Sequence, residues 1–216
     1  MKLPGSIAGM LAGFLMFVAS GSVASAHPHQ FIDLKVDVMF DSSGKAVGLR
    51  QEWVFDALFT AYLIQGQDQN GDGKFDKAEL IDMLGRLLTN MSQEDYFTVV
   101  HESAEPTKFG SAKPVAASIE NEQLAIRFET PFAKPLGGKG KTFRYAVYDP
   151  TYYIAVLHRD GLKGVKLDAA AKGCKAEFQP SEPSTDQVAL AASLGINQSA
   201  GNGLGIHFAE WVYVKC

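Results

Sequence analysis

The sequence predicts an α+β fold, namely a mostly antiparallel β sandwich that carries an inserted helix–EF-hand loop–helix segment. Two observations carry this prediction. Short runs of alternating apolar and polar residues recur through most of the chain, which is typical of half-buried strands. Helical patterns are limited to residues 56–90 and residues 184–194. We expect the first helical region to be an insert in an otherwise β-rich chain.

The first strands form a predicted hairpin. Apolar residues occupy every second position from Ile32 to Phe40. Residues 41–44 have the composition of a turn, and a second strand follows from Val47 to Phe55. Asp56 is then placed to cap a helix that ends near Gln65.

Residues 68–79 match the EF-hand calcium-loop template D-x-[DN]-x-[DN]-G-x₅-E at every constrained position. Gly73 stands where the loop must turn sharply. Lys74 would contribute only its backbone carbonyl, Asp76 would hold a water molecule, and Glu79 would close the shell with both carboxylate oxygens. The predicted calcium ligands are Asp68, Asn70, Asp72, Lys74, Asp76 and Glu79. The alternative is an acidic helix-capping loop that holds no metal.

The rest of the chain returns to strand patterns after an exit helix at residues 77–90. Ser184 is placed to cap a further helix at 184–194, and residues 197–205 form a glycine-rich loop. The later predicted strands are 96–101, 116–119, 124–128, 143–148, 152–158, 175–178 and 206–214.

Residues 1–26 have the pattern of a cleaved signal peptide. Lys2 precedes an apolar stretch at 7–19, and Ala24-Ser25-Ala26 is a small-x-small cleavage site. The apolar stretch is shorter than the roughly 20 residues of a transmembrane helix. We therefore expect export to the periplasm, and a mature chain of residues 27–216 that forms one β-rich domain with its insert at about 56–90. An uncleaved N-terminal anchor is the alternative.

Export changes the expected role of calcium. Calcium is abundant outside the cytoplasm, whereas sensor EF-hands bind it at roughly 10⁻⁷–10⁻⁵ M. A sensor loop would therefore stay permanently occupied there. We expect the loop to act as a structural staple rather than as a switch.

Cys174 and Cys216 are the two cysteines of the chain. In an oxidising compartment they predict a disulfide that ties down the final strand. A metal thiolate or an intermolecular bridge would be the alternatives, but the chain has no Cys-x-x-Cys pattern that supports either.

Charge and motifs exclude several classes of function. The chain has 20 Lys and Arg against 24 Asp and Glu, a net charge of −4, and no basic stripe for nucleic acid or an anionic membrane. A phosphate-binding loop that would end at Gly140-Lys141-Thr142 lacks its first glycine, which argues against a nucleotide site. Glu105 stands where a zinc-protease helix needs its second histidine. The sequence therefore favours a non-enzymatic role.

The mature chain would begin with His27-Pro28-His29. On an extended backbone, residues two apart point to the same side, so two imidazoles can share a metal ion. Cleavage would also leave His27 a free α-amino group, with a pKa near 8, as a further ligand. Imidazole suits Ni, Co, Zn and Cu alike. His27 and His29 are thus a predicted transition-metal site, and the alternative is two solvated histidines at a frayed terminus.

Two histidines do not close a metal site, so further ligands are needed. A lone histidine inside a strand is more often a packed residue than a ligand. The candidates for completing the site are His101, Glu102, Asp149, His158 and His207.

The combined motifs resemble a family of bacterial exported proteins, the domain-of-unknown-function family DUF1007, which is labelled the periplasmic component of an uncharacterised ABC-type transport system. The resemblance covers the whole mature chain. It implies an accessory role in metal handling beside a nickel- or cobalt-type membrane permease, as a partner rather than as a two-lobed solute receptor. The matching motifs are His27-Pro28-His29, Glu52 to Asp56 with Phe59, Gln65-Gly66 with Asp68 to Glu79, Tyr96-Phe97, and Tyr148 to Tyr153.

Three functions remain open at this point. The first is an exported calcium-binding protein that handles a transition metal together with a membrane metal permease. The second is a copper-dependent redox enzyme in which the amine and imidazole of His27 grip the metal. The third is a purely structural or interaction protein stapled by calcium, with Tyr148, Tyr152 and Tyr153 as a docking surface. These tyrosines can equally flank an Asp-Pro turn with their rings in the core.

Overall fold

The computed structural model describes residues 27–195 and 197–216. The predicted signal peptide therefore lies outside the described residues. The α-helices are α1 (Ala57–Ile64), α2 (Lys77–Met91) and α3 (Thr185–Ser193), and the 3₁₀ helices are η1 (Ser92–Phe97), η2 (Gly161–Gly164) and η3 (Gly205–Phe208). The strands are β1 (Gln30–Phe40), β2 (Ala46–Phe55), β3 (Thr98–His101), β4 (Lys113–Glu120), β5 (Gln123–Leu136), β6 (Thr142–Val147), β7 (Ile154–His158), β8 (Val165–Leu167), β9 (Lys175–Gln179) and β10 (Trp211–Lys215).

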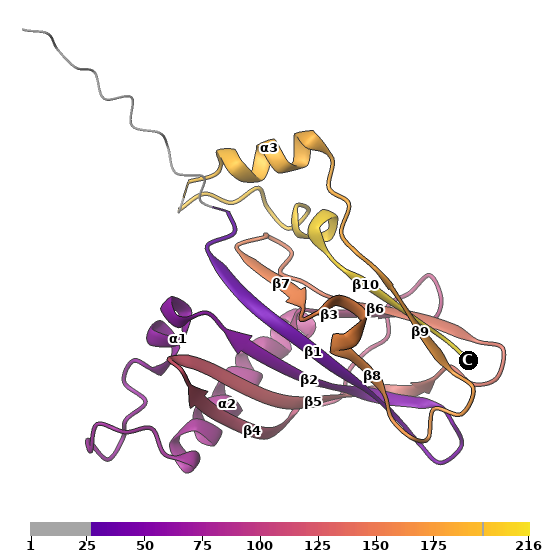
Figure 1. Cartoon of the computed structure of the whole chain (residues 1–216), viewed down its shortest axis with the longest axis horizontal. Coiled ribbons are helices and arrows are strands. Elements are labelled where there is room, and N and C mark those ends of the chain that lie inside the picture. The colour runs from indigo at the N-terminus through magenta and orange to yellow at the C-terminus, as the bar shows by residue number, and fades with distance from the viewer. Residues whose placement is uncertain (1–26, 196) are drawn as a thin grey trace, which may run out of the picture.

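The strands form two sheets, so the chain has an α+β fold with mostly antiparallel pairing. The larger sheet has the order β4-β5-β2-β1-β7, and β8 also pairs with β1. The smaller sheet has the order β3-β6-β10-β9. Every pair is antiparallel except β1 with β7 and β1 with β8, which are parallel. In Figure 1, α1 lies beside the end of the larger sheet at which β1 begins.

The predicted first hairpin is confirmed. Strands β1 and β2 pair from Ile32 opposite Phe55 to Phe40 opposite Ala46. Ile32, Leu34, Val36, Val38 and Phe40 of β1 are buried, and the residues between them are partly or fully exposed. This is the burial pattern expected from the alternating sequence, because successive side chains of a strand point to opposite faces.

The inward faces of the two sheets contribute to one hydrophobic cluster. Each buried aliphatic or aromatic side chain stabilises the fold by roughly 1.5–3 kcal/mol. Sharing of one core by both sheets is compatible with the expected sandwich. From the larger sheet the cluster includes Ile32, Leu34, Val36, Leu49, Ile126 and Phe128, and from the smaller one Val100, Phe143, Tyr145, Val212 and Val214.

The helices lie where the sequence places them, and their predicted caps are present. The side chain of Asp56 accepts a hydrogen bond from the Phe59 amide at the start of α1, and Ser184 caps α3 in the same way. Asp76 and Glu79 form a capping box at the start of α2. Within the described residues, each helix is too short or too polar to cross a bilayer.

Three predicted strands begin later than the sequence pattern suggests. The strand expected at 152–158 begins at Ile154, because Tyr152 has a positive φ angle of 60°. The strand expected at 96–101 begins at Thr98, because Asp95, Tyr96 and Phe97 all have positive φ angles of 47–57°, which no strand adopts. The strand expected at 206–214 begins at Trp211, because residues 205–208 form η3. Strand β8 was not predicted, since three residues are too few for a periodic signal.

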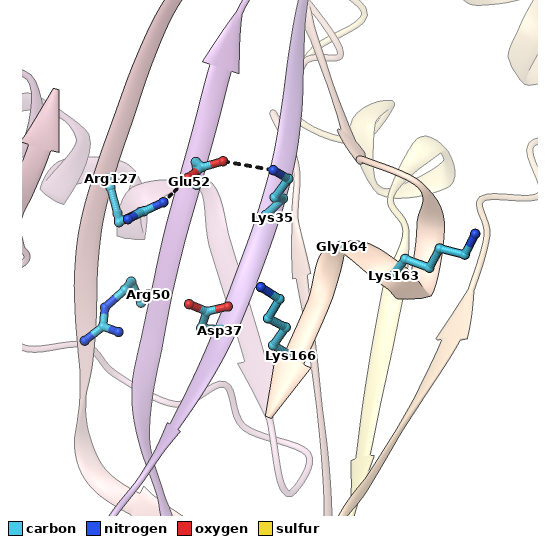
Figure 2. Close-up of a pocket in the computed structure, with 8 residues that line it drawn as sticks. All are labelled: Lys35, Asp37, Arg50, Glu52, Arg127, Lys163, Gly164 and Lys166. Carbon is cyan, nitrogen blue, oxygen red and sulfur yellow. Dashed lines mark hydrogen bonds and ion pairs between the residues drawn. The ribbon is translucent and has the colours of Figure 1, made fainter. Parts of the chain in front are cut away.

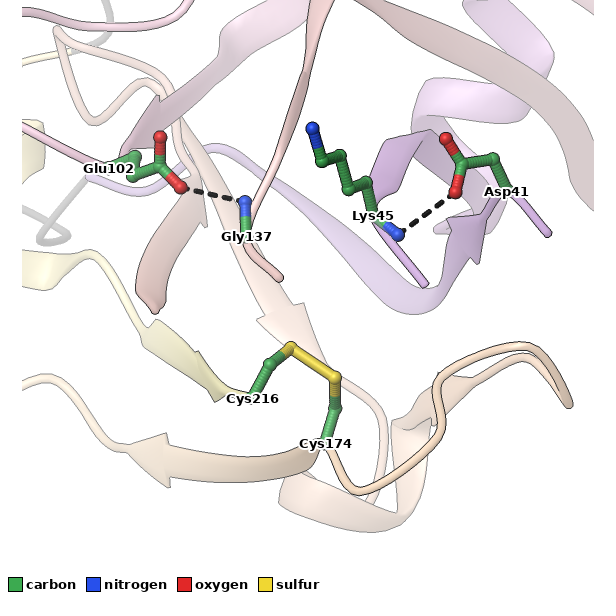
Figure 3. The surroundings of a disulfide bond; sticks show 6 residues. All are labelled: Asp41, Lys45, Glu102, Gly137, Cys174 and Cys216. Atoms are coloured by element: carbon green, nitrogen blue, oxygen red, sulfur yellow. Dashed lines mark hydrogen bonds between the residues drawn. A yellow bond between two sulfur atoms is a disulfide. The ribbon is translucent and has the colours of Figure 1, made fainter. Parts of the chain in front are cut away.

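The predicted disulfide between Cys174 and Cys216 is present. Cys216 directly follows β10 and Cys174 directly precedes β9, so the bridge closes one end of this antiparallel pair. The two cysteines are 42 residues apart in the sequence. Figure 3 shows the bridge near Gly137, in the connection between β5 and β6. The bridge therefore holds the C-terminus onto the smaller sheet. Such a bond is typical of proteins in oxidising compartments.

We expect reduction of this disulfide, or the Cys174→Ser substitution, to lower the free energy of unfolding by about 2–5 kcal/mol, because the unfolded chain regains the freedom of a closed loop. Chemical denaturation with and without reductant measures the change. Thiol titration of the denatured, unreduced protein should detect no free thiol. Two titratable thiols would contradict the bridge.

Candidate metal centre

His27 and His29 lie directly before β1, at the end of the larger sheet. The His29 backbone N–H donates a hydrogen bond to the Tyr153 carbonyl, with N and O 2.9 Å apart. One residue further along, Gln30 pairs with Ile154 at the start of the parallel β1–β7 ladder. The histidine segment is therefore an ordered extension of this ladder rather than a frayed terminus.

The two imidazoles lie edge-on against one another, with His27 buried and His29 partly buried. Their ring centroids are 4.6 Å apart, and His27 is only 6% exposed. Both ring nitrogens of His27 and the Nε2 atom of His29 are buried, and none has a hydrogen-bond partner among the described residues. A buried polar atom without a partner costs about 1–3 kcal/mol, so three such atoms in one place would gain from a partner outside the protein chain, such as a water molecule or another ligand.

Tyr153 completes a cluster of three rings. Its ring centroid lies 4.6 Å from that of His29 and 5.8 Å from that of His27. The sequence offered Tyr153 only as part of a docking surface or core, because nothing local indicates that it contacts residues more than 120 positions away. The parallel pairing of β1 with β7 creates this contact.

A tight loop holds Tyr153 in place. The buried Asp149 carboxylate accepts hydrogen bonds from the backbone N–H groups of Thr151 and Ile154, at 2.9 and 3.0 Å. Gly205 contacts the other side of the loop so closely that a β-carbon there would lie 1.8 Å from the Asp149 carbonyl oxygen. The loop is thus shaped by contacts on both sides, and Asp149 serves as its organiser.

The environment favours the neutral form of His29. Burial lowers the pKa of His29 below its ordinary value of 6.5, and the positive charge of protonated His27 lowers it further. Neutral imidazole is the form that coordinates a metal. The surroundings of His29 therefore favour the protonation state that a metal ligand requires.

The five residues that could have completed the site have other positions. Asp149 organises the Tyr153 loop, Glu102 accepts a hydrogen bond from the Gly137 N–H, and the His101 ring lies against Trp211. His207 is exposed in η3, and His158 is buried in the core. Within residues 27–195 and 197–216 there is no group of three or more His, Cys, Asp or Glu side chains arranged to hold a metal ion.

His158 belongs to a separate buried network between the two sheets. Glu210 Oε2 accepts a hydrogen bond from the His158 backbone N–H at 2.6 Å and lies 3.0 Å from its ring Nδ1. The other ring nitrogen, Nε2, lies 3.4 Å from the Tyr145 hydroxyl. Burial raises the pKa of Tyr145 well above its ordinary value. This network satisfies His158 with protein partners, which sets it apart from His27.

The predicted calcium loop, residues 68–79, follows α1 and includes the first three residues of α2. The Asp68 carboxylate accepts hydrogen bonds from the Gly71, Asp72 and Gly73 amides at 2.8–3.2 Å. Gly73 has a φ of +77°, which agrees with its predicted role at the sharp turn. The loop therefore wraps around the carboxylate at its first position.

Glu79 closes the same loop from α2. It is 7% exposed, and its carboxylate oxygens accept hydrogen bonds from the amides of Gln69, Asn70 and Asp76 at 2.8–3.3 Å. A buried carboxylate directed into a loop that carries Asp68, Asn70 and Asp72 is chemically suited to calcium, which prefers oxygen ligands. In this structure the Asp68 and Glu79 carboxylates accept hydrogen bonds from backbone amides. Among the described residues, the acidic side chains of the loop do not converge into a group of three that could hold a metal ion.

A charged hollow occupies the outer face of the larger sheet. Glu52 pairs with Lys35, at 3.2 Å, and with Arg127, and Arg50 pairs with Glu129 at 2.6 Å. Figure 2 shows Lys163, Gly164 and Lys166 of the neighbouring turn bordering the same hollow. Partly exposed ion pairs of this kind contribute about 0–1 kcal/mol each. They form a charge ladder across β1, β2 and β5.

Comparison with known proteins places the chain in a family. Residues 11–216 match the family model described as protein of unknown function DUF1007. The chain belongs to the DUF1007 family. It is similar to an uncharacterized protein of Haemophilus influenzae, with 26% identity over 206 residues that cover 93% of this chain and 95% of that protein. It is also similar to an uncharacterized 15.5 kDa protein in the trpE 3′ region of Spirochaeta aurantia, with 28% identity over 112 residues, 51% of this chain and 79% of that protein.

DUF1007 membership confirms the resemblance drawn from the sequence motifs. The match spans both the histidine segment and the loop at 68–79. The descriptions of the two relatives name no ligand. Any role for these two segments in this DUF1007 protein therefore rests on their own residues.

In this DUF1007 protein we expect His29 to titrate below pH 6.5 in the metal-free state, because burial and the nearby His27 both disfavour its charged form. Since the folded pKa is below the unfolded one, the folded state should lose stability as the pH falls from about 6.5 through the folded pKa. NMR titration of the imidazole resonances measures the pKa. In the His27→Ala variant the His29 pKa should move back toward 6.5, and a His29 pKa at or above 6.5 in the unsubstituted protein would contradict the description of this site.

Proposed function

We propose that this protein is an exported calcium-stapled protein that binds a transition-metal ion through His27 and His29 and exchanges it with a membrane metal permease. The observation that carries the proposal is the set of three buried imidazole nitrogens without partners. Elsewhere in the molecule a buried histidine, His158, is paired with Glu210 and Tyr145. The contrast favours a ligand at the histidine pair.

The third metal ligand in this proposal is the α-amino group of His27, which cleavage after Ala26 would create. An amine and two imidazoles are nitrogen donors, which suit Ni, Co, Zn and Cu. Three protein ligands leave a coordination position open, as exchange with a partner requires. The His29 backbone bond to Tyr153 would hold the second imidazole at a constant position during such an exchange.

Calcium has a structural role in the proposal. Its ligands would be Asp68, Asn70, Asp72, the Lys74 carbonyl, Asp76 and Glu79, in the EF-hand pattern. The closed backbone of the loop around Asp68, the positive φ of Gly73 and the burial of Glu79 support this assignment. Calcium would replace backbone amides as the partner of the two end carboxylates and so fix α1 relative to α2.

The membrane permease is the partner that the family resemblance suggests, and the disulfide is compatible with the oxidising compartment in which such a protein would meet it. The copper-enzyme alternative uses the same two histidines. It is distinguished from the proposed function by a preference for copper over the other metals and by a copper-specific electron paramagnetic resonance spectrum. In the purely structural alternative, substitution of both histidines would leave function intact.

We expect the chain that starts at His27 to bind one of Ni²⁺, Co²⁺, Zn²⁺ or Cu²⁺, and His27→Ala or His29→Ala to weaken binding at least tenfold. Calorimetry on metal-free protein measures this, with exposed His207→Ala as the matched control. Affinity should fall from about pH 8 to pH 6, because amine and imidazole bind only when deprotonated. A chain that retains Ala26 loses the His27 amine and should bind more weakly. Equal binding by the double histidine variant would move the metal elsewhere.

We also expect calcium to raise the free energy of unfolding, by about 2.7 kcal/mol when its concentration is 100 times the Kd. The Glu79→Gln variant should lose most of this gain, because it removes the negative bidentate ligand. Glu182→Gln, the same chemical change at an exposed glutamate outside the loop, is the control. Thermal unfolding with calcium and with chelator measures the effect, and an unchanged melting temperature would overturn the structural role.

A further inference from the structure

We propose that Asp56 couples the calcium loop to the histidine site, so that calcium in the loop raises the affinity of His27 and His29 for their metal ion. This inference rests on the proposed function and adds its regulation. It assigns to Asp56 a positioning role, since this residue contacts neither metal ion. The coupling follows from the way in which one carboxylate joins two segments of the chain.

The Asp56 side chain has a separate partner for each oxygen. Oδ1 accepts a hydrogen bond from the Phe59 backbone N–H at 2.8 Å, which caps α1. Oδ2 accepts a hydrogen bond from the Phe31 backbone N–H at 2.9 Å, in strand β1. The Asp56 backbone N–H also donates to the Phe31 carbonyl at 3.2 Å. Residue 56 therefore binds both backbone groups of Phe31 and the first turn of the helix.

Phe31 is two residues from His29. Between Phe31 and the histidine the backbone is held by the β1–β7 ladder, in which Gln30 pairs with Ile154, and by the His29 bond to the Tyr153 carbonyl. A shift at Phe31 would be transmitted along this short extended segment to both imidazoles. The position of Asp56 thus influences the geometry of the histidine pair.

The other end of the connection is helix α1. It has 8 residues, whereas isolated helices shorter than about 12–15 residues are marginal in water, so its order depends on external contacts. Its contacts include the Asp56 cap, the packing of Phe59 and Leu63 on the core, and the buried Thr60 hydroxyl, which accepts a hydrogen bond from the Leu124 N–H at 2.9 Å. The loop that begins at Asp68 follows the other end of the helix. Calcium would add a further constraint by tying the end of α1 to α2.

The energetic consequence has a defined sign. A calcium-filled loop orders α1, an ordered α1 holds Asp56, and Asp56 holds Phe31 in the arrangement that presents both imidazoles. The metal at the histidine pair then meets a site that is already ordered and binds more tightly. Because coupling is reciprocal, the transition metal must raise the affinity for calcium by the same factor.

The test is a pair of calorimetric titrations on the processed chain that starts at His27. The tightest binding ion of Ni²⁺, Co²⁺, Zn²⁺ and Cu²⁺ is titrated into calcium-free and calcium-loaded protein. We expect a Kd at least about fivefold lower with calcium, within the usual range of allosteric coupling. Calcium titrated with and without that ion should give the same factor.

Asp56→Asn isolates the proposed connection. The remaining amide oxygen can still cap Phe59, but the NH₂ group cannot accept a hydrogen bond from the Phe31 N–H. The variant should retain both binding sites while the calcium-dependent change in Kd falls below about twofold. The matched control is Asp168→Asn, because Asp168 similarly bridges the Phe40 N–H, at 2.7 Å, and the Ala170 N–H, at 2.9 Å, at the opposite end of β1. The control should leave the coupling intact.

The outcomes separate this inference from the proposed function. If the transition metal binds with the same Kd in both calcium states, the coupling is wrong and the metal site still stands. If Asp56→Asn retains the full coupling, the role assigned to Asp56 is wrong and the metal site again still stands. Absence of transition-metal binding to calcium-loaded protein overturns the proposed function and the coupling together. If Asp56→Asn does not fold, the titrations of the unsubstituted protein still decide whether coupling exists. Calcium-induced shifts of the His27 and His29 imidazole NMR signals provide a second readout.

Discussion

The parallel pairing of β1 with β7 is the interaction on which the candidate site depends. It joins residues 30–34 to residues 154–158, and it begins one residue after His29. Parallel neighbours require a long connection, so this pairing forms only after the chain has passed through β2, the helical insert and strands β3 to β6. The ladder brings Tyr153 against the two imidazoles and gives the otherwise terminal His27-Pro28-His29 segment a defined backbone position. Without it, the histidines would be solvated side chains on a loose strand end.

Much of the local structure could be predicted from the sequence, because it depends on neighbouring residues. Alternation located β1 and β2, side-chain oxygens before helices identified the caps Asp56 and Ser184, and the EF-hand template located the loop between α1 and α2. The cysteine pair was predictable because only one pairing within the chain exists. In each case the signal lies within a dozen residues or in the count of a single residue type.

The contacts that define the site could not be predicted in the same way. Tyr153 lies more than 120 residues from His29, and Glu210 lies 52 residues from His158, so no local pattern connects them. The left-handed backbone at Asp95 and Tyr96 also contradicts the strand pattern of their neighbours, and it is maintained by tertiary contacts such as the bond from the Ala112 N–H to the Tyr96 hydroxyl. Such positions cost of order 1–3 kcal/mol each, which only the surrounding packing can offset.

The comparison of the two buried histidines explains why only one of them points to a ligand. Desolvating an imidazole is tolerated when its nitrogens meet protein groups, and His158 has Glu210 on one side and Tyr145 on the other. His27 is buried to the same extent, 6% exposed, but its neighbours are rings that offer no hydrogen bond within the described residues. The aromatic rings lower the local dielectric around both nitrogens, so an electrostatic interaction made there is stronger than the same interaction at an exposed histidine. A partner for the His27 nitrogens would therefore remove a desolvation cost that the protein itself already offsets at His158.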